Sequence, residues 1–337
     1  MQDTIKKSKE PWQAELKSAI TRIPDLLSYI SLPSHPLVSN QHTHFPILVT
    51  TSWADRIKKG CPDDPLLLQV LPQKIETQAM PGFTQDPLEE NHQTPVPGCI
   101  HKYQGRVLLT LLGQCAIHCR YCFRQHFPYQ THQFNPARWK AICAYISQDP
   151  SIYEVIFSGG DPLLLPDRLL RTCLQDIASI PHVRYVRFHT RVPIVLPSRM
   201  TDAFVQILTE SRLQSAIVIH SNHPQELSPE IKTRLRHIHQ QGICLLNQSV
   251  LLKGINDNAQ VLANLSHALY EAGVLPYYLH RLDTVHGSQA FSLTVEEETS
   301  IVQTLYSLLP GYLVPRFVVE VPHAASKIPI IIPHMRP

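Results

Sequence analysis

The chain has 337 residues, 43% of them hydrophobic and 17% charged, with a formal charge of +3. This length suffices for a sizeable core and by itself suggests about two domains. The positive charge comes without a block of Lys or Arg, which excludes the basic stripe typical of nucleic-acid-binding proteins. No apolar stretch approaches the ~18 residues of a membrane span, and the N-terminal sequence MQDTIKKSKEPW lacks the apolar core of a secretory signal. We therefore expect a cytosolic (cytoplasmic) protein with reduced cysteines and no membrane or nucleic-acid partner.

Residues 1–100 are irregular and rich in Pro, with a short helical pattern over 14–20. We expect them to form an N-terminal cover rather than an independent domain. The pattern changes at Arg106, where near-continuous apolar runs begin, as expected for parallel strands covered by helices. The six runs span 106–112, 153–159, 183–189, 215–221, 243–252 and 275–282.

Each run is followed by a segment with helix start and stop signals. Asn135 and Ser228 each precede a Pro at the first helical position, and Thr294 with Glu297 predicts a capping box. Residues 257–272 carry one apolar helix face. Six β-then-α units with right-handed crossovers predict an α/β fold that curls into a barrel or partial barrel.

A further strand-like segment at 314–321 follows the sixth helix. The predicted organisation is therefore a cover over 1–100, a barrel over 101–312 and a C-terminal segment over 313–337. Ligands of such folds bind at the C-terminal ends of the strands. Short polar stretches lie at those ends, namely GQCAIHCRYC, SGGDP, HTR, HSNHP and HRLDTVHG. We expect the active site there.

Cys115, Cys119 and Cys122 lie in the loop after the first run. A structural zinc site takes four ligands, and His118 or His126 could supply the fourth. Such sites usually use two separated ligand pairs, whereas here three thiolates fall within eight residues. A cubane iron–sulfur cluster held by three thiolates keeps one iron open to another ligand. The spacing favours the cluster, and zinc stays open as an alternative.

The CxxxCxxC spacing, with Tyr121 before the third cysteine, resembles the signature of the radical S-adenosylmethionine (SAM) enzymes. The resemblance implies a partial (β/α)6 TIM-like barrel, in agreement with the six units. It also implies a [4Fe-4S] cluster that binds S-adenosylmethionine at its open iron and, once reduced, cleaves it to a 5′-deoxyadenosyl radical. SGGDP is similar to the GGD segment of these enzymes, so the resemblance assigns Gly159, Gly160 and Asp161 to S-adenosylmethionine binding.

The segment HKYQGRVLL (101–109) resembles the pyridoxal 5'-phosphate (PLP)-binding segment of the lysine 2,3-aminomutase branch of that family. The resemblance assigns Lys102, Tyr103 and Arg106 to this cofactor. A lone lysine in a loop is usually a surface residue. Lys327, however, lies where the branch carries the lysine that forms a Schiff base with pyridoxal phosphate, and is the implied catalytic residue.

NQSVLLKGIND (247–257) is also similar to the branch, and His220 and Gln248 match S-adenosylmethionine positions. Two departures concern the pyridoxal phosphate site. The glycine-rich run before the lysine is His-Ala-Ala-Ser here, and an Arg of the phosphate segment is Lys102. The second change replaces a bidentate fork with a point charge.

Three positions match the substrate residues of the branch. Arg124 matches the group that pairs with the substrate carboxylate, which suits a guanidinium fork. Asp283 and Glu320 match the two acids that hold the ε-ammonium of L-lysine, and Glu320 is one methylene longer than the Asp of the fermentative mutases. The resemblance is greatest to the bacterial branch that makes (R)-β-lysine for elongation factor P. It implies a separate ligase that receives the product, and a reductant for the cluster.

Two alternative functions remain open from the sequence. One is a mutase that serves the catabolism of free lysine or another amino acid, and the other is a non-catalytic zinc-binding module. The remaining cysteines carry no chemical signal. Cys143, Cys173 and Cys244 lie among apolar residues and are expected to pack in the core, while Cys61 and Cys99 receive no assignment.

Overall fold

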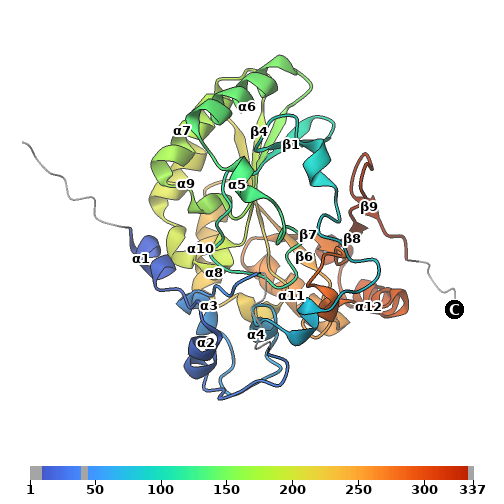
Figure 1. The fold of residues 1–337 in the computed structure, drawn as a ribbon. Coiled ribbons are helices and arrows are strands. Elements are labelled where there is room, and N and C mark those ends of the chain that lie inside the picture. Colours follow the sequence, from blue (N-terminus) through green and yellow to red (C-terminus); the bar gives the residue numbers. More distant parts are fainter. Residues whose placement is uncertain (1–9, 39–44, 333–337) are drawn as a thin grey trace, which may run out of the picture.

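The computed structural model describes residues 10–38 and 45–332. Residues 1–9 lie outside the described residues; they belong to the N-terminal sequence that lacks the apolar core of a secretory signal. One nine-stranded sheet runs through the molecule, and its strands follow one another in chain order (Figure 1). The strands are β1 Cys99–Tyr103, β2 Arg106–Leu109, β3 Glu154–Phe157, β4 Tyr185–Thr190, β5 Gln214–Ile219, β6 Cys244–Val250, β7 Leu275–His280, β8 Arg316–Val319 and β9 Ile328–Pro329.

Seven strands, β2 to β8, are parallel, and an antiparallel strand lies at each edge of the sheet. The first and last strands are not hydrogen-bonded neighbours, so the curved sheet is a partial rather than a closed barrel. This confirms the predicted fold class. The edge strands β1 and β9 were not predicted, and they carry the two segments assigned above to pyridoxal phosphate.

Helices cover the outer face of the sheet (Figure 1). They are α6 Pro136–Gln148, α7 Asp167–Ala178, α9 Asp202–Thr209, α10 Pro229–Gln240, α11 Ala259–Glu271 and α12 Val295–Leu308. Two short helices, α5 Tyr129–His132 and α8 Val192–Val195, lie in the connections after β2 and β4. The predicted caps are confirmed. Asn135 and Ser228 accept hydrogen bonds from backbone N–H groups of α6 and α10, and Thr294 with Glu297 forms the capping box of α12. In the described part of the chain, no helix is long and apolar enough to traverse a bilayer.

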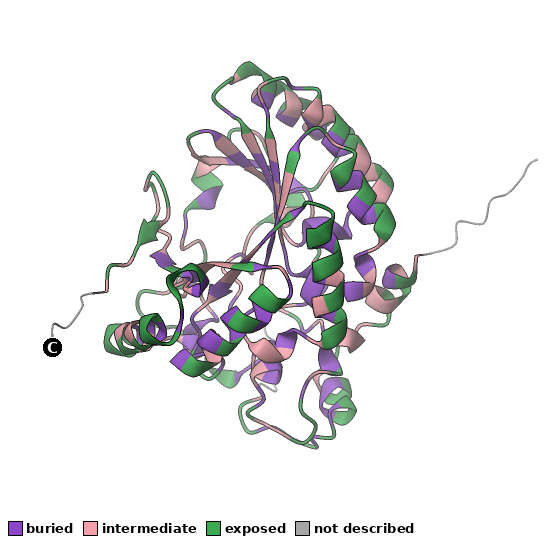
Figure 2. Ribbon diagram, turned by 180° about the vertical axis from the view of Figure 1, so that it is seen from behind, coloured by how far each residue is buried: buried purple, intermediate pink, exposed green. Residues whose placement is uncertain are grey.

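The N-terminal segment packs against the barrel through short helices, α1 Pro11–Lys17, α2 Ile23–Tyr29, α3 Thr51–Ala54 and α4 Pro65–Leu68. Trp53 and Leu66 share one apolar cluster with Phe157 and Phe188 of the strands. Buried residues lie on the strands and the inner faces of the helices, while the outer helix faces are exposed (Figure 2). The cover and the barrel therefore bury their apolar surface together.

Side chains on one strand alternate between the helix-covered face and the interior of the barrel. Along β4, Val186 and Phe188 are fully buried in the apolar core. Arg187 and His189 point to the opposite face, which is the interior of the barrel. Cys244 is exposed, so the expectation that it packs in the core is wrong; it is the first residue of β6, and the burial of that strand begins only with the next residue.

Candidate active site

The three cysteines predicted to bind the cluster lie in the loop between β2 and α5, at the C-terminal ends of the parallel strands. None of the three forms a disulfide bond, and each is partly exposed to solvent: Cys115, Cys119 and Cys122. Burial, together with the charge of neighbouring thiols in the triad, raises the pKa of the Cys115 thiol well above its usual value and the pKa of Cys122 to about 12. The three sulfurs therefore share one region. Thiolates form there readily only when a cation offsets their charge.

The two histidines considered as a fourth zinc ligand have other partners. His118 Nδ1 lies 2.8 Å from the Pro46 carbonyl oxygen, and its ring stacks on Phe45. His126 Nε2 lies 3.2 Å from the His286 carbonyl oxygen. Among the residues that the structure describes, no three His, Cys, Asp or Glu side chains are arranged around a single-ion position. In a four-iron cluster each thiolate binds a different iron, so the sulfurs need not surround one ion.

A buried polar network lies beside the cysteine loop. The Arg191 guanidinium donates to Cys119 Sγ at 2.7 Å and to Gln69 Oε1 at 2.6 Å. The hydroxyl of Tyr121 lies 3.1 Å from Gln69 Oε1 and 2.9 Å from His220 Nε2. Arg191 belongs to the HTR stretch noted at a strand end, but nothing in the sequence singles out Gln69. The N-terminal cover thus supplies part of the wall behind the cysteine loop.

The SGGDP stretch after β3 packs directly against the cysteine loop. A Cβ on Gly160 would lie 2.2 Å from the Gln114 carbonyl oxygen, so only glycine permits this approach. Asp161 uses its carboxylate to hold the end of β4, with its shortest hydrogen bond from Thr190 Oγ1 at 2.6 Å. Burial raises the pKa of Asp161 to about 6, against the effect of its hydrogen bonds. Of the three residues predicted to bind S-adenosylmethionine here, Asp161 orders the loops, and Gly159 and Gly160 form the close contact.

His220 and Gln248, the other two predicted S-adenosylmethionine residues, occupy neighbouring strand ends. His220 Nδ1 lies 2.9 Å from the Gln248 backbone carbonyl oxygen, which fixes the proton on Nδ1. Burial and the Arg191 charge lower the pKa of His220 to about 4, so its ring is neutral at pH 7. Gln248 lies at a bulge in the pairing of β6 with β7.

The predicted pyridoxal phosphate residues gather around one carboxylate, that of Glu320 after β8. Lys102 Nζ lies 2.7 Å and the Tyr103 hydroxyl 3.0 Å from Glu320 Oε1. Lys327 Nζ forms an ion pair with Glu320 Oε2. The Arg106 guanidinium lies 4.7 Å from the centroid of the Tyr103 ring. The structure thus brings together four predicted cofactor residues from the two edges of the sheet, in and beside β1 and directly before β9.

The two predicted substrate acids, Asp283 and Glu320, are close enough for the charge of Glu320 to raise the pKa of Asp283, but their surroundings differ. Burial alone would raise the pKa of Glu320, but Lys327 and Lys102 lower it below its usual range. Burial and the charge of Glu320 raise the pKa of Asp283 to about 7. Glu320 already holds two ammonium groups, whereas Asp283 is a half-buried carboxyl that a cation would ionise. Asp283 is therefore the better placed of the two to receive a substrate ammonium group.

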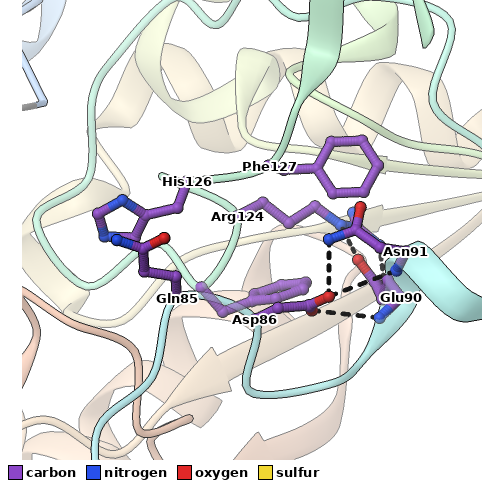
Figure 3. Close-up of a pocket in the computed structure, with 8 residues that line it drawn as sticks. Gln85, Asp86, Glu90, Asn91, Arg124, His126 and Phe127 are labelled. Carbon is purple, nitrogen blue, oxygen red and sulfur yellow. Dashed lines mark hydrogen bonds and ion pairs between the residues drawn. The ribbon is translucent and has the colours of Figure 1, made fainter. Parts of the chain in front are cut away.

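Arg124, the predicted partner of the substrate carboxylate, forms a buried bidentate ion pair with Glu90 (Figure 3). Nε and one Nη donate to the two Glu90 oxygens at 2.7 Å each. Burial alone would lower the pKa of Arg124, but Glu90 raises it overall. The charge of Arg124 acts on the pKa of Cys122, and the charge of Glu320 acts on the pKa of Arg124. Arg124 thus connects the cysteine loop with the Glu320 side of the site.

Two histidines face the interior of the barrel, one in the HTR stretch and one in the HRLDTVHG stretch, and neither was assigned a role from the sequence. The Nε2 atoms of His189 and His280 are buried without a hydrogen-bond partner among the described residues. Burial lowers the pKa of both rings well below the usual value, and the charge of Lys327 lowers both further. A buried polar atom without a partner is costly. These two atoms near Lys327 therefore fit a site that holds a polar ligand, as the donor set of the cysteine loop fits an iron–sulfur cluster.

Comparisons with known proteins agree with this geometry. Residues 103–182 match the model of a 4Fe-4S single cluster domain. The chain is 44% identical over 326 residues to an L-lysine 2,3-aminomutase of Escherichia coli K12, covering 96% of this chain and 95% of that protein. The chain belongs to the lysine 2,3-aminomutase family of radical S-adenosylmethionine enzymes. Members of this family are isomerases, and they use a [4Fe-4S] cluster and S-adenosylmethionine.

Other relatives carry the same name. An L-lysine 2,3-aminomutase of Haemophilus influenzae is 42% identical, with 97% of each chain covered. One of Clostridium subterminale is 32% identical, with 95% of this chain and 77% of the relative covered. A crystal structure of a radical SAM methyltransferase from Sphaerobacter thermophilus aligns with a TM-score of 0.43 at 16% identity, covering 87% of this chain and 80% of that one.

Proposed function

We propose that the chain is a cytoplasmic, pyridoxal phosphate-dependent enzyme that converts L-lysine to (R)-β-lysine for the modification of elongation factor P. The observation that carries the proposal is the gathering of Lys327, Lys102 and Tyr103 around Glu320. Arg124 lies two residues after Cys122, and its charge acts on the pKa of Cys122 while the charge of Glu320 acts on its own pKa. Family membership supports the aminomutase chemistry. The resemblance to elongation factor P β-lysylation protein B supports the biological role.

When bound, the cluster and S-adenosylmethionine supply a carbon radical, and pyridoxal phosphate supplies a π-system for the migrating amino group. The residues of the chain hold and orient these groups. Cys115, Cys119 and Cys122 would bind the cluster, and Lys327 would bind pyridoxal phosphate. His189 and His280 offer neutral ring nitrogens toward the interior, where a cofactor or substrate would satisfy them.

The substrate would lie between a cation and an anion at opposite ends. Arg124 takes the α-carboxylate, and Asp283 takes the ε-ammonium group. An ammonium group beside Asp283 favours its ionised form, and the resulting pair offsets the cost of burying either charge alone. Glu320, which pairs with Lys327 and Lys102 in the protein alone, would be a second acid for the ammonium group.

The direct test is anaerobic incubation with L-lysine, a reductant, S-adenosylmethionine and pyridoxal phosphate. We expect β-lysine from the parent protein and none from Lys327→Ala, which also loses the absorbance that borohydride reduction fixes to the parent chain. An active Lys327→Ala protein would contradict the assignment of the catalytic lysine.

The role in elongation factor P modification needs a cellular measurement. Deletion of the gene is expected to lower the mass of elongation factor P by one β-lysyl group, and the parent gene is expected to restore it. An unchanged mass would leave the aminomutase activity intact and assign it to free lysine instead. The separate ligase and the cluster reductant belong to this same proposal.

A further inference from the structure

Glu90, from the N-terminal cover, lies against the predicted substrate arginine and has no role in the function proposed above. It opens the 3-10 helix Glu90–Gln93. Its carboxylate and the Arg124 guanidinium are both buried and face each other side-on (Figure 3). The inference drawn from this pair rests on the proposed function, because it concerns how Arg124 receives a substrate carboxylate.

The hydrogen-bond count of the guanidinium shows what remains for a ligand. An arginine side chain has five N–H donors in a fixed plane. Two of them go to Glu90, and a third goes from the other Nη of Arg124 to Ser158 Oγ at 3.1 Å. Among the residues that the structure describes, no acceptor takes the two other N–H groups on the terminal nitrogens, which remain for a ligand. A carboxylate accepts two parallel N–H groups, so this remainder matches one substrate carboxylate.

The backbone that carries Glu90 is itself held in place. Asp86 Oδ1 accepts a hydrogen bond from the Glu90 backbone N–H at 3.1 Å, and its other oxygen accepts from Asn91 Nδ2 at 2.8 Å (Figure 3). On the arginine side, the guanidinium lies 4.7 Å from the centroid of the Phe123 ring. Neighbouring residues thus hold both Glu90 and Arg124 in place. This is expected of a side chain that must bind a substrate in one orientation.

We propose that Glu90 is a positioning residue for substrate recognition: with Ser158, it orients Arg124 so that its two remaining N–H groups receive the α-carboxylate of the substrate. The charge of Glu90 also keeps the guanidinium neutralised when no substrate is bound. The site therefore selects amines that carry a carboxylate at the right distance. A second carboxylate can bind the same guanidinium, because Glu90 accepts only from Nε and one Nη of Arg124.

The test compares binding of L-lysine with binding of 1,5-diaminopentane, which has both amino groups but no carboxylate. The holoenzyme is reconstituted with cluster, S-adenosylmethionine and pyridoxal phosphate, and the change in pyridoxal phosphate absorbance gives each dissociation constant. Glu90→Gln removes the charge, and Glu90→Asp keeps the charge but shortens the reach. We expect both variants to weaken L-lysine binding about tenfold. Binding of 1,5-diaminopentane should change by less than about twofold.

The chain offers a matched control in a second buried pair of the same kind. Arg120 Nε donates to Glu76 Oε1 at 3.0 Å and its Nη2 is paired with Glu76 Oε2, but another Nη donates to the Phe45 carbonyl oxygen. Glu76→Gln makes the same chemical change in the same loop region. It is expected to lower the unfolding temperature as Glu90→Gln does, while the ratio of the two dissociation constants stays at the parent value.

Ser158→Ala gives a milder variant if the Glu90 variants do not accumulate as folded protein. It removes one acceptor of Arg124 without leaving a buried charge unpaired, and it should weaken L-lysine binding about threefold.

The proposal is overturned if the folded Glu90 variants keep the parent ratio of the dissociation constants of L-lysine and 1,5-diaminopentane. It is also overturned if Glu90→Gln binds L-lysine more tightly, because Glu90 would then be a competitor for Arg124. These results would leave β-lysine formation by the parent intact. A parent that neither binds L-lysine nor forms β-lysine would overturn the proposed function as well.

Discussion

Lys102 and Glu320 form a partly buried ion pair, with 2.7 Å between Nζ and Oε1, although they lie 218 residues apart in the chain. Both positions depart from what the resemblance implies: the phosphate segment of the family has an Arg at the position of Lys102, and the fermentative mutases have an Asp at the position of Glu320. The shorter cation and the longer carboxylate offset each other in reach. The two departures therefore form one structural unit between the edge strand β1 and the end of β8.

This pairing predicts strong coupling between substitutions at the two sites. Lys102→Arg alone adds bulk to a filled space, and Glu320→Asp alone withdraws the carboxylate from both lysines. We expect each single variant to lower kcat/KM about tenfold, and the double variant to recover most of that loss. The measurement is a double-mutant cycle on β-lysine formation. Additive losses would show that the two departures are independent.

The pKa of Asp283, raised to about 7 by burial and Glu320, predicts how substrate affinity depends on pH. The nearby charges of Glu90, Lys327 and Lys102 also act on this carboxyl. A substrate ammonium group needs the ionised form. The dissociation constant of L-lysine should therefore fall by up to about tenfold per pH unit as the pH rises toward 7, and then level off.

Asp283→Asn is the control for that profile, because it cannot ionise and should flatten the dependence. The same carboxyl affects stability with a defined sign. Between about pH 4 and pH 7 the folded protein keeps a proton that the unfolded chain has lost. As the pH rises from about 4 to 7, the free energy of unfolding of the parent should therefore decrease relative to that of Asp283→Asn. An opposite slope would contradict the raised pKa.

The close approach of Gly160 to the cysteine loop predicts a loss of cluster on adding one methyl group. The added Cβ would meet backbone atoms of Gly113 and Gln114, which cannot yield as a flexible side chain would. Gly160→Ala should therefore contain less iron and labile sulfide per chain after anaerobic purification. Gly311→Ala is the control, since no atom lies within 4 Å of a Cβ there. Equal iron content in both variants would refute the prediction.

Cysteine substitution separates a cluster from a zinc site. Cys119→Ala should abolish both iron and labile sulfide, because three thiolates are the least that holds a cubane with one open iron. Cys244→Ala, at the exposed start of β6, should keep the parent content of both. Bound zinc without sulfide in the parent protein would instead support the binding-module alternative.

Local sequence patterns predicted much of the fold and the cysteine loop. The caps at Asn135, Ser228 and Thr294 were readable because a cap and its backbone partners lie within three residues of one another. The parallel strands were readable because burial on both faces leaves continuous apolar runs. The edge strands β1 and β9 escaped prediction because they are short: β1 buries only its first two residues, and β9 has two exposed residues, so neither leaves a long apolar run.

The sequence by itself was enough to predict a ligand set in the cysteine loop, because its three thiols fall within eight residues and their spacing needs no long-range contact. The tertiary structure alone decided which charges meet. Glu90 joins Arg124 across 34 residues, and Glu320 joins Lys102 across 218. Such pairs depend on how the curved sheet brings its edges and the N-terminal cover together. That curvature follows from the packing of the whole chain, and no local pattern encodes it.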